Sequence, residues 1–119
     1  MNANEILEYC LTKKGVTESF PFDQETLVIK VGTKMFLLMS LERQPLGISV
    51  KTDPEWSAEL REQYFQITGA FHMNKTHWNS VSIDGLKKEL VLKMIDHSYD
   101  LVFKSLTKKA KEEILNAEY

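Results

Sequence analysis

The alternation of hydrophobic and polar residues predicts a helix at the start of the chain, over residues 3–14. Its hydrophobic residues recur at helical spacing and define one buried face: Ile6, Leu7, Cys10 and Leu11. Asn2 or Asn4 can cap the first turn, acids come early and lysines come late. Gly15 follows as the expected C-terminal cap of this helix.

Three runs with the composition of β-strands follow, at Thr26–Val31, Lys34–Leu41 and Leu46–Lys51. The Gly-Thr pair between the first two runs is typical of a two-residue type II′ hairpin. The second run is almost continuously apolar, so we expect a central strand that is covered on both faces. Before these runs, Phe20-Pro-Phe-Asp23 predicts only an extended segment that leads into a turn.

The second half of the chain returns to helical spacing. Asp53-Pro54 predicts a helix start, and a helix of about twelve residues follows. One stripe at helical spacing marks its buried face: Trp56, Leu60, Tyr64 and Ile67, the last just past the helix end. A strand at Asn79–Ile83 precedes a helix that begins at Leu86, with an expected break near Ser98. A short helix at 106–115 ends the pattern.

These elements predict a single domain over residues 1–119, of class α+β. The expected order is α-β(3)-α-β(2)-α with C-terminal helices, because short strands joined by tight turns pair antiparallel. Helices on one face of such a five-stranded sheet make a two-layer fold.

Composition narrows the class of protein but not its function. A chain of 119 residues with 43% hydrophobic and 27% charged residues is typical of a globular protein. Its single cysteine, Cys10, excludes an internal disulfide and favours a cytoplasmic location, with Cys10 as a small core residue. No apolar run is long enough to span a bilayer, and we expect no membrane contact.

The net charge of −2 argues mildly against a strong polyanion binder. The charge is uneven, however, since lysines are concentrated in residues 86–111. A local basic surface is compatible with an acidic total, and lysines on solvated helix faces are the simpler interpretation.

The stretch Gly69–Val81 concentrates the unusual chemistry of the chain, because it holds His72, His77 and Trp78 and no acid. The five-residue spacing of the histidines does not place them on one face of a strand or a helix, so we expect no metal site. No nucleophile elbow, phosphate loop or carboxylate pair accompanies them, so we expect no enzyme, no catalytic residue and no cofactor. Aromatic, amide and lysine side chains together favour recognition of nucleic acid or peptide. The alternative is structural: Trp78 in the core, with asparagines and histidines bonded to the main chain.

A series of short strings resembles the MmcQ/YjbR family of small bacterial proteins. The strings cover nearly the whole chain: Phe20-Pro-Phe22, Ile29–Phe36, Lys51 with Pro54, Leu60-Arg-Glu62, His72–Lys75 with His77-Trp-Asn79, and Ser98-Tyr99 with Leu101-Val102. The resemblance implies a fold similar to type III secretion chaperones. It also implies DNA binding, by similarity to a "double wing" seen in a phage transcription factor. No catalytic residue follows from it.

Together, the residues and the resemblance predict a non-enzymatic DNA-binding or transcription-associated protein. The residues expected to meet nucleic acid or a partner are His72, Asn74, Lys75, His77, Trp78, Asn79, Lys34, Lys87 and Lys88. The alternative is a protein- or peptide-binding module, as a monomer or a dimer. It binds through its sheet face and its apolar strand at 35–41. A small-molecule or enzymatic role ranks third, and it requires His72, His77 and Asn74 to converge on a concave pocket.

Overall fold

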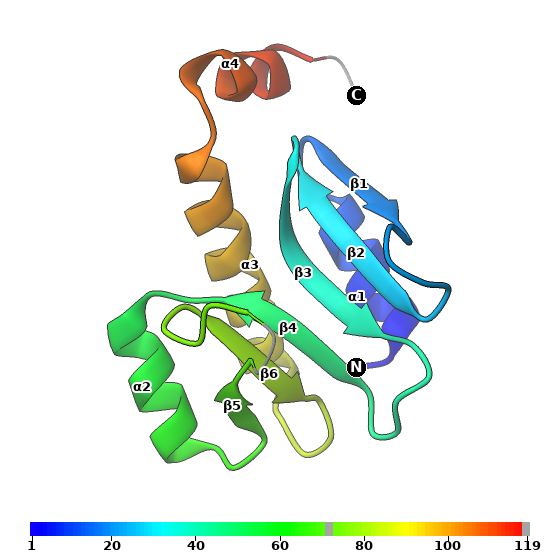
Figure 1. The fold of residues 1–119 in the computed structure, drawn as a ribbon, viewed down its shortest axis with the longest axis vertical. Coiled ribbons are helices and arrows are strands. Elements are labelled where there is room, and N and C mark those ends of the chain that lie inside the picture. Colours follow the sequence, from blue (N-terminus) through cyan, green and yellow to red (C-terminus); the bar gives the residue numbers. More distant parts are fainter. Residues whose placement is uncertain (71–72, 118–119) are drawn as a thin grey trace.

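The computed structural model describes residues 1–70 and 73–117 of the chain. It contains one antiparallel sheet with the strand order β1-β2-β3-β4-β6-β5, accompanied by four helices (Figure 1). The elements in chain order are α1 (Ala3–Leu11), β1 (Val16–Ser19), β2 (Thr26–Val31), β3 (Lys34–Ser40), β4 (Gly47–Lys51), α2 (Pro54–Gln63), β5 (Ile67–Gly69), β6 (Trp78–Ser82), α3 (Lys88–Ser105) and α4 (Lys108–Asn116). The α+β class with an antiparallel sheet is confirmed. The expected count of five strands is wrong, since the described residues form six.

The helices α1 and α3 cover one face of the sheet, behind it in the view of Figure 1. Apolar side chains of the strands and of these two helices form one core. Its fully buried members include Ile6, Ile29, Leu37, Val50 and Ile95. From Ile48 to Lys51 in β4 and from Asn79 to Ser82 in β6, buried residues alternate with half-buried ones, as the two-residue period of a strand requires. The face away from α1 and α3 therefore keeps partly exposed side chains that can meet a partner.

The sequence pattern missed the edge strand β1 and gave no range for the edge strand β5, although it predicted two strands after the second helix. In β1, Val16 pairs with Val31 of β2, but three of its four residues are exposed. A strand without a buried face has no hydrophobic alternation to reveal it. In β5, Ile67 pairs with Val81 of β6 because α2 already ends at Gln63. Ile67 lies past the helix end as predicted, but in a strand.

The capping residues predicted at the starts of the first two helices are confirmed. Asn2 caps α1 and forms a reciprocal capping box with Glu5. Asp53 accepts a hydrogen bond from the Trp56 backbone N–H, and Pro54 occupies the first position of α2. The predicted C-cap at Gly15 is wrong, since α1 ends at Leu11 and Thr12 caps it.

Gly15 has a different role in packing. It adopts a φ of 76°, and a Cβ there would lie 2.9 Å from side-chain atoms of Ile114 in α4. Only glycine permits both the conformation and the close approach. The position therefore lets the C-terminal helix sit against the turn between α1 and β1.

The β2–β3 hairpin turns at Gly32, whose φ of 60° fits the predicted type II′ turn. The pairing register shifts between Ile29 and Lys30, so that Phe36 is an extra residue on β3. The prediction that β3 is covered on both faces is wrong. Its buried residues Phe36, Leu37 and Met39 lie in the core, whereas Met35 and Leu38 are only half-buried.

The expected break near Ser98 is also wrong, because α3 runs without interruption to Ser105. Ser98 is fully buried and bonds two strands. Its hydroxyl accepts from the Lys51 backbone N–H at 2.8 Å and donates to the Phe36 carbonyl at 2.5 Å. A serine that can start a turn in water instead satisfies the backbone of the sheet here.

Cys10 is buried in the core, as the pattern predicts, and burial raises the pKa of its thiol to about 12. Within residues 1–70 and 73–117, no helix has both the length and the apolar character to cross a membrane.

A lysine-lined cavity as the candidate functional site

A cavity of about 510 Å³ opens beside the β2–β3 hairpin, where β3 and β4 separate. It draws on several elements that are distant in sequence. Its lining residues are Pro21, Phe22, Val28, Lys30, Thr33, Lys34, Met35, Lys51, Trp78, Val102 and Ser105. The volume lies within the range of roughly 300–1,000 Å³ that is usual for ligand sites.

The cavity exists because two neighbouring strands part. Pairing between β3 and β4 covers only Leu37–Ser40 and Gly47–Val50. Beyond that ladder, the hydroxyl of Ser98 links the two strands in place of direct pairing. The C-terminal end of α3 then closes the space with Val102 and Ser105.

Three lysines line this cavity, and its described lining contains no carboxylate. Lys30 and Lys34 come from the two strands of the hairpin, and Lys51 comes from the end of β4. Lys34 Nζ donates to the carbonyl of Ser105 at 3.1 Å and to the Ser105 hydroxyl at 3.3 Å, which leaves at least one of its three N–H groups for a ligand. Within the described residues none of these three ammonium groups forms a salt bridge. The site is therefore locally cationic in a chain of net charge −2.

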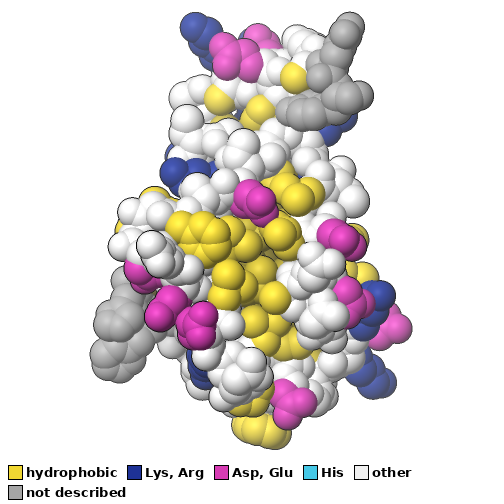
Figure 2. Space-filling model, turned by 90° about the vertical axis from the view of Figure 1, so that its right-hand side faces the viewer, with side chains coloured by type: hydrophobic (Ala, Val, Ile, Leu, Met, Phe, Trp, Pro, Cys, Tyr) yellow, Lys and Arg dark blue, Asp and Glu magenta, His cyan; other side chains and the backbone are white. Residues whose placement is uncertain are grey.

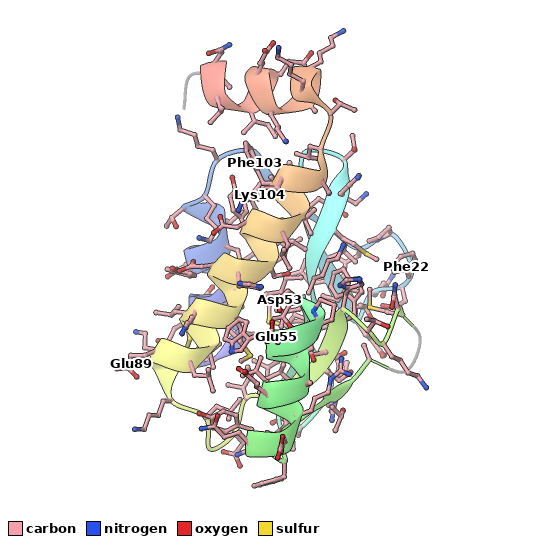
Figure 3. The ribbon with its side chains drawn as sticks, turned by 90° about the vertical axis from the view of Figure 1, so that its left-hand side faces the viewer. Phe22, Asp53, Glu55, Glu89, Phe103 and Lys104 are labelled. Carbon is pink, nitrogen blue, oxygen red and sulfur yellow. The ribbon has the colours of Figure 1, made fainter. Side chains whose placement is uncertain are left out.

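Aromatic and aliphatic groups form the rest of the wall. Trp78 lies opposite Lys51 in the β4–β6 pairing and keeps 8% of its surface exposed. Phe22 is 69% exposed, and it lies on the side of the sheet away from α1 (Figure 3). Hydrophobic side chains also gather across the face shown in Figure 2, with charged groups around them.

Within the stretch Gly69–Val81, Asn79 has a structural role. Asn79 is fully buried. Its amide nitrogen donates to the Thr52 hydroxyl at 2.8 Å, and its carbonyl oxygen accepts from Arg61 Nε at 2.9 Å. The amide also lies 3.5 Å from the buried Ser57 hydroxyl. Asn79 therefore joins β6, α2 and the end of β4, and it is not available to a partner.

Arg61 extends this network to the β5–β6 loop. Its Nη2 donates to the carbonyls of Lys75 at 2.5 Å and of Trp78 at 3.1 Å. Asn74 accepts from the Thr76 N–H at 3.0 Å, and its carbonyl accepts from the His77 N–H at 3.2 Å. These bonds shape the loop, and they place Trp78 at the cavity.

The predicted contact residues thus divide into separate groups. Lys34 and Trp78 lie in the cavity, whereas Asn74 and Asn79 serve the scaffold. His77 is half-buried, its carbonyl accepts from the Thr52 N–H at 2.8 Å, and it does not line the cavity. Lys75 is exposed, and His72 lies outside the described residues.

Lys87 and Lys88 belong to a different region. They lie at the start of α3, where Lys88 Nζ is 4.0 Å from a carboxylate oxygen of Glu5. A helix rises 1.5 Å per residue, which separates Lys88 from Ser105 by about 25 Å along α3. Because Ser105 borders the cavity, one compact ligand cannot contact both groups.

Sequence reasoning missed Phe22, Lys30 and Lys51 as candidate binding residues. All three belong to the strings that resemble the family, which was the only available signal.

The third histidine, His97, was not a candidate and has a local role. Its Nε2 lies 3.1 Å from Asp53 Oδ2, and its ring packs edge-on against Trp56. No group of three His, Cys, Asp or Glu side chains in the described part of the chain is placed to hold a metal ion.

The sequence model of the YjbR family matches residues 11–101, most of the chain. The chain belongs to the YjbR family. It is 35% identical to the uncharacterized protein YjbR of Escherichia coli K12 over 101 residues, which is 83% of this chain and 85% of that protein. A second relative, the uncharacterized protein YbdF of Escherichia coli O157:H7, is 34% identical over 80% of this chain and 79% of its own.

Solved structures share the fold of this YjbR-family chain. A crystal structure of a Deinococcus radiodurans protein matches with a TM-score of 0.89 and 37% identity, over 95% of this chain and 87% of the other. A Pseudomonas syringae protein matches with a TM-score of 0.73 and 23% identity, over 86% of this chain and 99% of its own. The second likeness concerns the fold alone.

Proposed function

We propose that this YjbR-family chain is a non-enzymatic nucleic-acid-binding protein that holds DNA at the lysine-lined cavity. The observation that carries the proposal is the cavity lining itself, with Lys30, Lys34 and Lys51, exposed Phe22 and no described carboxylate. Phosphates attract lysines, and base rings stack on aromatic side chains. Both features of DNA have a counterpart in this one site.

The acidic total charge does not oppose this proposal. A ligand responds to the local field, and ionic screening limits the reach of distant charges to about 10 Å at 0.1 M salt. The open face beside the cavity also carries the small hydroxyl residues Ser49 and Ser80, which pair across β4 and β6. Hydroxyls are common phosphate contacts in protein–DNA interfaces.

A salt series tests the proposal. Fluorescence anisotropy with labelled single-stranded and duplex DNA should give measurable binding at low salt. If three phosphates are neutralised, the slope of log K against log salt should lie between about −2 and −3. An affinity weaker than roughly 10⁻⁴ M at low salt, or a slope near zero, contradicts the proposal.

A protein- or peptide-binding module is the second candidate. Phe20 and Phe22 are 47% and 69% exposed. Hydrophobic side chains also form an exposed patch on the face shown in Figure 2. Exposed apolar patches favour protein partners. Light scattering after size exclusion, followed by a pull-down, tests this candidate: a strict monomer that captures no partner counts against it.

A further inference from the structure

We infer that the cavity accepts an unpaired nucleotide of a DNA strand, with its base against Phe22 and its flanking phosphates at the lysines. This inference rests on the proposed function and specifies the form of nucleic acid that the site takes. It follows from the shape of the site, the exposure of its aromatic wall and the arrangement of its charges.

The shape of the site is a concave cavity rather than a ridge. Its apolar lining comes mainly from the sheet, where Met35 is half-buried and Trp78 keeps 8% of its surface exposed, while Val28 and Val102 are buried behind them. A paired base in a duplex presents only its edges in the grooves, while its faces are covered by neighbouring bases. A base can therefore reach such surfaces only when it is unpaired or is turned out of the stack, and a single strand incurs the smallest cost.

Phe22 is the aromatic group most available for stacking. It lies on the segment between β1 and β2 and keeps 69% of its surface exposed, although it borders the cavity. Trp78, at 8%, offers a limited part of its ring to the cavity. A base that enters therefore has Phe22 on its open side and the sheet residues Met35 and Trp78 on the other.

The lysines are placed to contact a backbone on either side of that base. Lys30 and Lys34 flank the turn of the β2–β3 hairpin, while Lys51 lies across the gap on β4. Apart from the lysines, the polar side chains of the lining are Thr33 and Ser105. Ser105 already donates its hydroxyl to the Val102 carbonyl at 2.6 Å. With few groups left to read base edges, the site should bind different bases with similar affinity.

The experiment compares ligands and variants by fluorescence anisotropy at one low salt concentration. The ligands are a labelled ten-nucleotide thymidine strand, a blunt duplex of equal length, and thymidine monophosphate as competitor. The variants are Phe22→Ala, Lys51→Gln and Phe65→Ala. Phe65 is the matched control, because it is 90% exposed in the turn between α2 and β5.

We expect the strand to bind about tenfold or more tightly than the duplex. Phe22→Ala should weaken strand binding by about fivefold or more, as loss of one stacked base requires, and Phe65→Ala should leave it unchanged. The monophosphate, with one phosphate group, should compete far more weakly than unlabelled strand.

Equal affinity for strand and duplex, or no effect of Phe22→Ala, overturns this inference. If Lys51→Gln still weakens both ligands in that case, the proposed function stands without it. Competition by the monophosphate as strong as that by the strand also overturns it, in favour of a free nucleotide. Failure of both DNA forms to bind overturns the proposed function and the inference together.

Discussion

Replacing Asn79 by alanine should lower the free energy of unfolding by about 3 kcal/mol. The change removes the group that pairs with Arg61 Nε at 2.9 Å and with the Thr52 hydroxyl at 2.8 Å. Each buried polar group that loses its partner costs about 1–3 kcal/mol, and more when it is charged. Every fully buried side-chain nitrogen and oxygen in the described part of the chain has a partner, and the variant removes the Asn79 oxygen that Arg61 Nε pairs with.

Thermal and urea unfolding measure this effect. For a domain of this size, a loss of about 3 kcal/mol corresponds to a fall in Tm of about 10 °C. Ser80→Ala is the matched control, because Ser80 is the next residue on β6 and is only half-buried on the opposite face. If Asn79→Ala is no more harmful than Ser80→Ala, the structural role assigned to Asn79 is wrong.

The second large effect concerns binding. A variant with Lys30, Lys34 and Lys51 all changed to glutamine should bind DNA about tenfold or more weakly, since each exposed charge pair contributes up to about 1 kcal/mol. Its salt slope should also fall toward zero, because the phosphates that released counterions are no longer neutralised. Anisotropy titrations at several salt concentrations measure both quantities.

The control must remove the same charge elsewhere. Lys87, Lys88 and Lys93 lie on the N-terminal part of α3 and are exposed. Their triple glutamine variant has the same net charge as the cavity variant, so it isolates position from total charge. Equal losses in the two variants would mean that DNA contacts the whole basic surface, and a loss only in the control would relocate the site to α3.

The hydrophobic pattern was sufficient to predict the elements that carry a buried stripe. Residues such as Ile6 and Cys10 in α1, or Trp56 and Leu60 in α2, repeat at helical spacing, and local caps mark the starts. The exposed edge strand β1 has no such pattern. Ser98 misled the prediction because its preference for turns is local, whereas its hydrogen bonds join residues 47 and 62 positions away.

The cavity was beyond sequence reasoning for a similar reason. It brings together the β2–β3 hairpin, the end of β4, the start of β6 and the end of α3. No periodicity within one element predicts where two strands will separate. The stretch Gly69–Val81 predicted Trp78 as a contact residue, and the structure places Trp78 at the cavity. Asn74 and Asn79, predicted in the same way, belong to the scaffold that holds it.

The most direct test of the account uses the two tryptophans as reporters. Trp78 borders the cavity, whereas Trp56 packs against His97 and Lys93 of α3. In a nitrogen-15-labelled protein, each indole N–H gives its own NMR signal. Titration with single-stranded DNA should shift the Trp78 signal and leave Trp56 in place. A shift of Trp56 alone, or no shift of Trp78 at saturation, would contradict the claim that nucleic acid binds in this cavity.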